Sequence, residues 1–140
     1  MLGLVLDDAI DMLERDAPRY ASGMAGCLSS LPIGVDIDDE HFAIASDRER
    51  VRRVARSEHV MVEIRTTTTT MLRLLDGDLS LVDAIRRDDL RLRGAAESIH
   101  SLQDALGWFL LGCARCSGAP ALLDRLRGDV RARTHEVTHG

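Results

Sequence analysis

The chain has 140 residues, of which 45% are hydrophobic, 29% charged and 3% aromatic. This length predicts one domain, large enough to fold without a disulfide or a metal ion. The 18 basic and 23 acidic residues give a net charge of -5, which argues against a nucleic-acid partner because phosphate contacts require a basic excess.

Two helices are expected at the N-terminal end. Apolar residues at helical spacing predict the first helix over Leu4–Leu13, and a second from Pro18 to about Leu28, before Pro32. The first residues lack a basic segment and meet Asp7 too early for a secretory signal. The most apolar later stretch, 105–114, is too short to span a bilayer. We therefore expect a cytoplasmic protein without an integral membrane segment.

Strand patterns follow Pro32. Ile33–Asp38 alternates apolar and polar residues, and Phe42 and Ile44 continue the period of two. The segment Glu49–Ala55 fits either a bulged strand or a short helix, whereas His59–Arg65 alternates clearly. Together these segments predict an antiparallel meander with one covered face.

The threonine run Thr66–Thr70 joins the last of these strands to a helix. Threonine suits both a strand end and a helix N-cap, so we interpret the run as a cap rather than a hydroxyl-lined site. The helix that follows, Met71–Leu75, should end with Gly77 at its C′ position. Ser80 and Asp83 resemble a capping box that begins a short helix.

The last strand is expected over Asp89–Arg93, followed by a long helix from about Ala96 to Cys116. Gly118 and Pro120 close that helix, and a final helix begins within Ala121–Leu126. The single domain thus consists of N-terminal helices at about 4–30, a core at about 33–118 and a C-terminal helix and tail at 119–140.

The stretch Leu72–Leu106, LRLLDGDLSLVDAIRRDDLRLRGAAESIHSLQDAL, resembles the sterol carrier protein 2 family. That family's pattern is a leucine-rich helix ending in Gly, a short helix with an Ala, an alternating strand ending in Gly, and a long Leu-rich helix. The chain departs from it at Asp88, where the family usually has Gly, and at Ala95, where it has an acidic or amide residue. The matching landmarks are Leu75, Gly77, Ala84, Leu90, Leu92, Gly94 and Leu102.

The resemblance covers roughly 33–116 and implies an α+β fold. Its five-stranded mixed, largely antiparallel sheet would be covered on one face by helices. Between sheet and helices such domains enclose an apolar tunnel for sterols, acyl chains or other lipids. The family brings no catalytic residue and no cofactor.

The long helix is apolar around much of its axis, since Trp108, Leu110 and Leu111 widen the stripe that contains Phe109. This width indicates burial on two sides, in a core, a dimer interface or a cavity wall. Gly107 and Gly112 indicate either close backbone packing or space for a ligand beside Trp108. The candidate pocket residues are Val62, Ile64, Leu72, Leu75, Leu90, Leu92, Leu106, Trp108, Phe109 and Leu110.

Other reactive residues have structural interpretations. Glu97, His100 and Asp104 share one helix face, which we expect to be a solvated face rather than an acid–base or metal site. Cys113 and Cys116 lie at a helix C-terminus, where the dipole does not favour a thiolate, so they are interpreted as small buried hydrophobes. The odd count of three cysteines implies no disulfide framework, and no metal or cofactor is expected.

The leading hypothesis is a carrier or binding protein for an apolar small molecule, such as a lipid or a sterol-like, polyketide-like or terpenoid-like metabolite. The first alternative is an enzyme of bacterial specialised metabolism that uses the same pocket. The second is an interaction module in which the wide apolar face of the long helix forms a homodimer.

Overall fold

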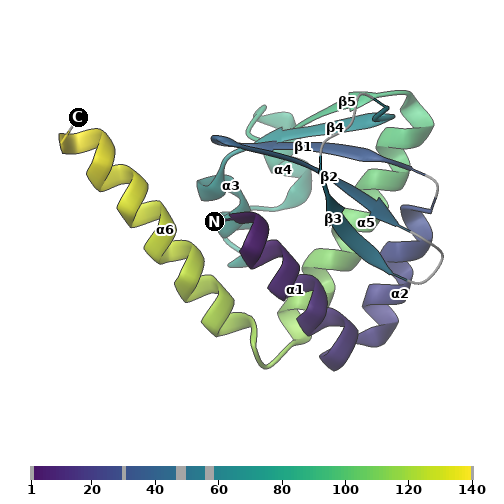
Figure 1. Ribbon diagram of the computed structural model, residues 1–140, viewed down its shortest axis with the longest axis horizontal. Coiled ribbons are helices and arrows are strands. Elements are labelled where there is room, and N and C mark those ends of the chain that lie inside the picture. Colours follow the sequence, from purple (N-terminus) through teal and green to yellow (C-terminus); the bar gives the residue numbers. More distant parts are fainter. Residues whose placement is uncertain (1, 30, 47–49, 56–58, 140) are drawn as a thin grey trace.

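The computed structural model describes residues 2–29, 31–46, 50–55 and 59–139, with side chains from residue 3 to residue 132 (Figure 1). Its elements in chain order are α1 (Leu2–Asp16), α2 (Pro18–Cys27), β1 (Ile33–Ile37), β2 (Glu40–Ser46), β3 (Val51–Val54), β4 (Val62–Thr66), α3 (Thr68–Leu75), α4 (Leu81–Arg86), β5 (Arg91–Gly94), α5 (Ala96–Arg115) and α6 (Ala119–His139). The segment that fitted either a strand or a helix is therefore a strand over Val51–Val54.

The five strands form one mixed sheet in the order β3-β2-β1-β4-β5. Strands β1, β2 and β3 form the expected antiparallel meander, but β4 does not extend it. Instead β4 lies parallel to β1, with Val35 opposite Ile64, and β5 is antiparallel to β4. The mixed, largely antiparallel sheet is confirmed, whereas the prediction that the fourth strand continues the meander is wrong.

Capping side chains fix the starts of the two short helices. The hydroxyl of Thr67 accepts a hydrogen bond from the Thr70 N–H at 3.1 Å, and Ser80 accepts one from the Asp83 N–H at 3.1 Å. Such bonds satisfy backbone donors that have no partner within the helix. One residue of the threonine run, Thr67, is the predicted cap; Thr66 ends β4, and Thr68–Thr70 form the first turn of α3, which therefore begins earlier than the Met71 expected from the sequence.

Two turns adopt a left-handed backbone. Gly77 follows the end of α3 with φ of 79°, which matches the predicted C′ glycine. Asp88 has φ of 60° between α4 and β5. This is the position where the sterol carrier protein 2 pattern usually has Gly, and aspartate is one of the few other residues that tolerate this conformation.

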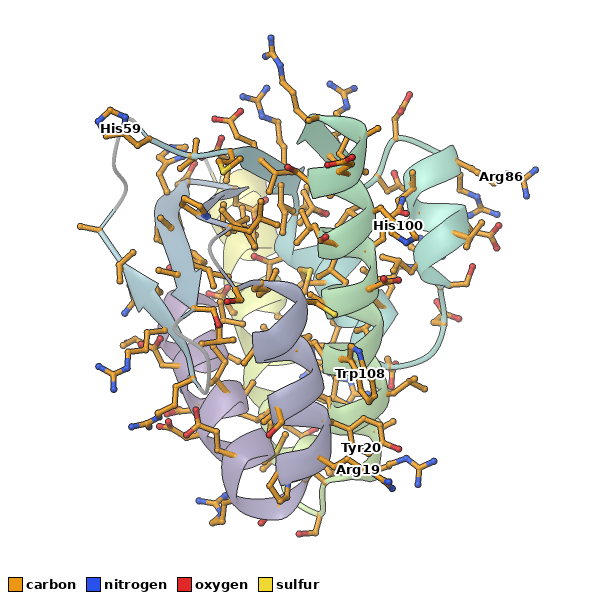
Figure 2. The ribbon with its side chains drawn as sticks, turned by 90° about the vertical axis from the view of Figure 1, so that its right-hand side faces the viewer. Arg19, Tyr20, His59, Arg86, His100 and Trp108 are labelled. Carbon is orange, nitrogen blue, oxygen red and sulfur yellow. The ribbon has the colours of Figure 1, made fainter. Side chains whose placement is uncertain are left out.

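Helices α1, α2, α3 and α5 cover one face of the sheet, as predicted, and the core lies between the two layers (Figure 1). Helix α5 also packs along α2 (Figure 2). Helix α6 lies outside this layer against α1, α3 and α5, and its far end extends away from the body (Figure 1). In the described part of the chain, no single helix has the length and apolarity needed to cross a membrane.

Candidate functional site

A space lined only by apolar residues lies between the sheet and the helices, and we call it the sheet cavity. Its volume is about 70 Å³. Strands β1, β2, β3 and β4 supply its floor, and α1, α2, α3 and α5 supply its roof. The residues that line it are Leu6, Ile10, Met24, Leu28, Ile33, Val35, Ile37, Ile44, Val51, Ile64, Met71, Leu90, Leu102, Ala105, Leu106 and Phe109.

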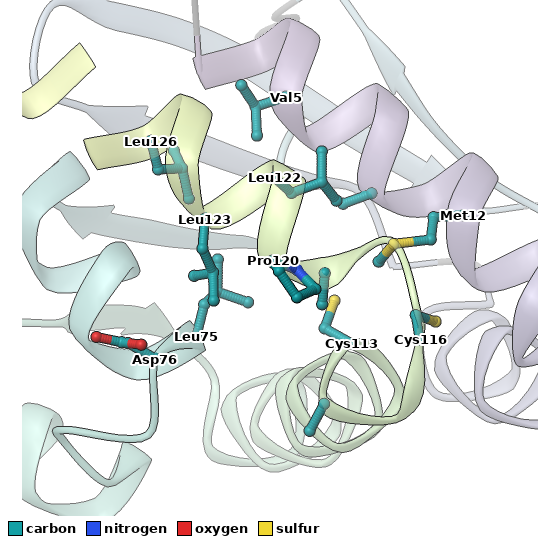
Figure 3. A pocket seen from close by; sticks show the side chains of 13 residues that line it. Val5, Met12, Leu75, Asp76, Cys113, Cys116, Pro120, Leu122, Leu123 and Leu126 are labelled. Carbon is teal, nitrogen blue, oxygen red and sulfur yellow. The ribbon is translucent and has the colours of Figure 1, made fainter. Parts of the chain in front are cut away.

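A second opening, the α6 groove, lies where α6 crosses α1, α3 and α5 (Figure 3). It is larger, about 290 Å³. Thirteen residues line it: Val5, Ala9, Met12, Leu75, Asp76, Cys113, Ala114, Cys116, Ala119, Pro120, Leu122, Leu123 and Leu126.

A smaller space of about 30 Å³, the middle void, lies between the other two. It shares Leu6, Ile37, Met71 and Phe109 with the sheet cavity, and it shares Val5, Ala9, Leu75 and Leu126 with the α6 groove. Apolar side chains alone therefore separate the three spaces.

Helix α6 is attached through its first two turns. Leu126 is completely buried between the α6 groove and the middle void. Around it, Arg125 pairs with Asp8 of α1, and Arg127 donates to Asp76 at 3.1 Å at the end of α3. These ion pairs are half-exposed and weak, so burial of Leu126 and its apolar neighbours is the main attachment.

Trp108 lies on the outer side of α5 instead of facing the sheet (Figure 2). Its ring packs against α2, where a Cβ added to Gly23 would meet it at 2.5 Å, and it contacts the Tyr20 ring edge-on at 5.7 Å between centroids. Of the two alternatives for the surroundings of Trp108, close packing and a ligand space, the structure shows packing against α2.

The two glycines of α5 have different surroundings. A Cβ at Gly112 would approach Leu13 Cδ2 to 2.5 Å. The absence of a side chain at this position therefore allows α5 to pack closely against α1 and α2. A Cβ at Gly107 would have no neighbour within 4 Å. Of the two interpretations of Gly112, the structure shows close packing.

The structure brings part of the predicted pocket set together. Ile64, Leu90, Leu106 and Phe109 line the sheet cavity, and Leu75 lines the middle void and the α6 groove. Val62 is buried on β4, and Leu72, Leu92 and Leu110 are half-buried against the core without lining these spaces.

The sequence did not indicate the α1 and α6 residues of the α6 groove. The apolar stripe of the first helix, which contains Ala9, and the Leu122–Leu123 pair were available signals. Neither signal shows which helices meet, because spacing along one helix defines a face and not its neighbour.

The Cys113 and Cys116 thiols are buried in the wall of the α6 groove. Burial, with a smaller contribution from Cys116, raises the pKa of Cys113 to about 12. Burial also raises the pKa of Cys116, whose Sγ donates to the Gly112 carbonyl at 3.3 Å. Both thiols are neutral at physiological pH and act as apolar lining.

The polar face of α5 forms only a loose contact. His100 Nε2 and Asp104 Oδ2 are 3.6 Å apart, and both side chains are exposed. Among the described residues, no group of three or more His, Cys, Asp and Glu side chains is arranged to hold a metal ion.

These features define a class: an α+β domain in which a one-sided helical layer and a mixed sheet enclose an apolar interior. No family model and no curated protein matches the sequence. Solved structures do match, and the fold is that of sterol carrier protein 2.

Three of these structures are informative. The ubiquinone synthesis protein UbiJ-SCP2 is 15% identical over 78% of this chain and 96% of its own, with a TM-score of 0.59. A crystal structure of sterol carrier protein 2 is 11% identical over 79% of this chain and 96% of its own, with a TM-score of 0.54. Sterol carrier protein domain 2 of Helicoverpa armigera is 12% identical over 70% of this chain and 79% of its own, with a TM-score of 0.51.

Proposed function

We propose that this protein binds and carries an apolar small molecule, which enters beneath α6 and extends toward the sheet. The observation that carries the proposal is the series of three adjoining spaces, of which the innermost, the sheet cavity, is lined by sixteen residues that are all apolar. A space with no polar group favours an apolar guest, because each apolar Å² removed from water contributes about 25 cal/mol.

The volumes indicate how a guest would be accommodated. The sheet cavity alone, at about 70 Å³, is much smaller than ordinary ligand pockets, which begin near 300 Å³. The α6 groove, at about 290 Å³, is close to that range. The guest would therefore rest mainly in the α6 groove and displace side chains around the middle void to reach the sheet.

The direct test is native mass spectrometry of the purified protein together with titration of Nile red, an uncharged apolar dye. We expect a co-purified lipid, or dye fluorescence that increases and saturates. A chain with no bound guest and no dye uptake would contradict the proposal.

A matched pair of variants on α5 localises the binding. Ala114 is exposed and lines the α6 groove, so Ala114→Trp fills the groove with little effect on the core. Leu111 is exposed on the same helix without lining the groove, so Leu111→Trp is the control. We expect Ala114→Trp to reduce dye affinity at least tenfold and Leu111→Trp to leave it unchanged. Equal affinities would place binding elsewhere.

A further inference from the structure

The α6 groove has one charged residue among its described lining residues, Asp76, whose carboxylate lies at the outer edge of the groove beyond Leu75 (Figure 3). Asp76 is the C-cap residue of α3 and is partly exposed at the edge of the groove. Arg127 donates to its Oδ1 at 3.1 Å, and no partner of Oδ2 is found in the described part of the chain. One acceptor oxygen is therefore available to a guest.

Helix ends strengthen the negative character of this wall. The C-terminal turn of α5, through Cys113 and Ala114, lines the groove, and α3 ends beside it at Asp76. The C-terminus of a helix carries a partial negative charge, which disfavours anions nearby.

The N-terminus of α6 does not offset this effect with free donors in the groove. The Ala119 N–H donates to the Cys116 carbonyl at 3.2 Å, and the Leu122 N–H donates to the Gly118 carbonyl at 3.4 Å. Pro120 has no N–H. Ala121, the remaining residue of this first turn, is not among the residues that line the groove.

The nearby arginines are already paired with acids. Arg125 pairs with Asp8, and Arg127 pairs with both Asp76 and Asp124. Neither arginine lines the groove. An anionic head group at this edge would therefore face Asp76 while the closest cations of α6 are occupied.

We infer that the guest has a head group that donates hydrogen bonds, a hydroxyl or an ammonium, which Asp76 receives, and that a carboxylate head is disfavoured. This inference rests on the proposed function and adds the class of ligand. The apolar part of the guest lies between α1, α5 and α6, and its head lies at the end of α3. Asp76 is partly exposed, so its effect on affinity is modest, about twofold to fivefold.

The test compares three guests with one chain length, dodecan-1-ol, dodecylamine and dodecanoate, as displacers of Nile red at low salt and about pH 8, where the acid is ionised and the amine protonated. A carboxylate binds more weakly to any apolar site because it must lose water. The informative quantity is therefore the change in the dodecanoate-to-dodecanol ratio of Kd between variants.

Asp76→Asn removes the charge and retains the shape. Asp124→Asn is the matched control, because Asp124 also pairs with Arg127 but does not line the groove. We expect Asp76→Asn to lower the dodecanoate-to-dodecanol ratio of Kd about twofold to fivefold and to weaken the binding of dodecylamine. Asp124→Asn should leave this ratio and the affinity for dodecylamine unchanged. High salt should lower the wild-type ratio in the same direction.

An equal ratio in wild type and Asp76→Asn, or an equal change in both variants, would overturn the inference and leave the proposed function intact. A wild-type ratio insensitive to salt would also count against it. If the protein takes up neither Nile red nor any of the three guests, the proposed function fails, and this inference fails with it.

Discussion

The sheet cavity and the α6 groove differ in volume, in lining and in position within the fold. The sheet cavity is lined by buried and half-buried apolar side chains and has a volume of about 70 Å³. The α6 groove is about 290 Å³, and ion pairs to Asp8 and Asp76 attach α6 beside it. The sheet cavity therefore lies within the core, whereas the α6 groove is larger and has one wall formed by a helix outside the main helical layer.

The largest expected effect tests whether the two regions differ in stability. Leu102 of α5 is buried and lines the sheet cavity, and Leu126 is buried on the inner side of α6. We expect Leu102→Ala to lower the free energy of unfolding by about 3 kcal/mol, because it enlarges a cavity in a core that cannot collapse. We expect Leu126→Ala to cost less than half of this, because α6 can shift inward. Urea unfolding gives both values.

Hydrogen exchange provides the control for this comparison. In Leu126→Ala, faster exchange should be confined to α6. If both variants lose equal stability and exchange faster throughout, α6 is part of the same cooperative unit as the core, and the contrast between the two regions does not hold.

The next effect concerns the wall of the α6 groove at alkaline pH. The pKa of Cys113 is raised from 9.0 to about 12, so the folded chain retains a proton that the unfolded chain loses above about pH 9. Stability therefore decreases as the pH rises from about 9 toward 12. The sequence has no lysine to obscure this effect.

For Cys113 alone we expect a loss of about 1 kcal/mol between about pH 8 and pH 10. The loss is measured as the difference between wild type and Cys113→Ala in urea unfolding at each pH. Parallel stability curves for the two proteins would mean that the groove wall is hydrated.

The smallest effect concerns the attachment of α6. Arg125→Gln removes the pair with Asp8, and because both side chains are about half-exposed, the cost should be about 0.5 kcal/mol. We nevertheless expect faster Nile red association in stopped-flow measurements, since α6 opens more often. Arg86→Gln, which removes an exposed pair within α4, is the control. Equal rates in both variants would show that α6 does not limit entry.

Local signals in the sequence predicted the elements well. The cap at Ser80 and the turn at Gly77 depend on neighbours within a few residues, and they lie where the sequence placed them, whereas the cap expected within the threonine run is Thr67. The alternation in β4 predicted a strand, but alternation does not specify the strand beside it. Its parallel pairing with β1 therefore appeared only in the structure.

The candidate site was less predictable because its walls come from distant segments. The periodicity of α5 shows that Trp108 and Phe109 point in different directions, but not which of them faces the sheet. That depends on α2, whose Gly23 accommodates the indole ring. The position of α6 likewise depends on contacts across more than a hundred residues, such as Arg125 with Asp8.

The placement of Trp108 has a consequence for spectroscopy. It is the single tryptophan of the chain, and its indole lies between α2 and α5, on the side of α5 away from the apolar interior. We therefore expect its intrinsic emission to respond to the separation of these two helices during unfolding more than to occupancy of the interior. Tryptophan fluorescence can therefore be used to follow unfolding, and detection of a guest needs an added dye.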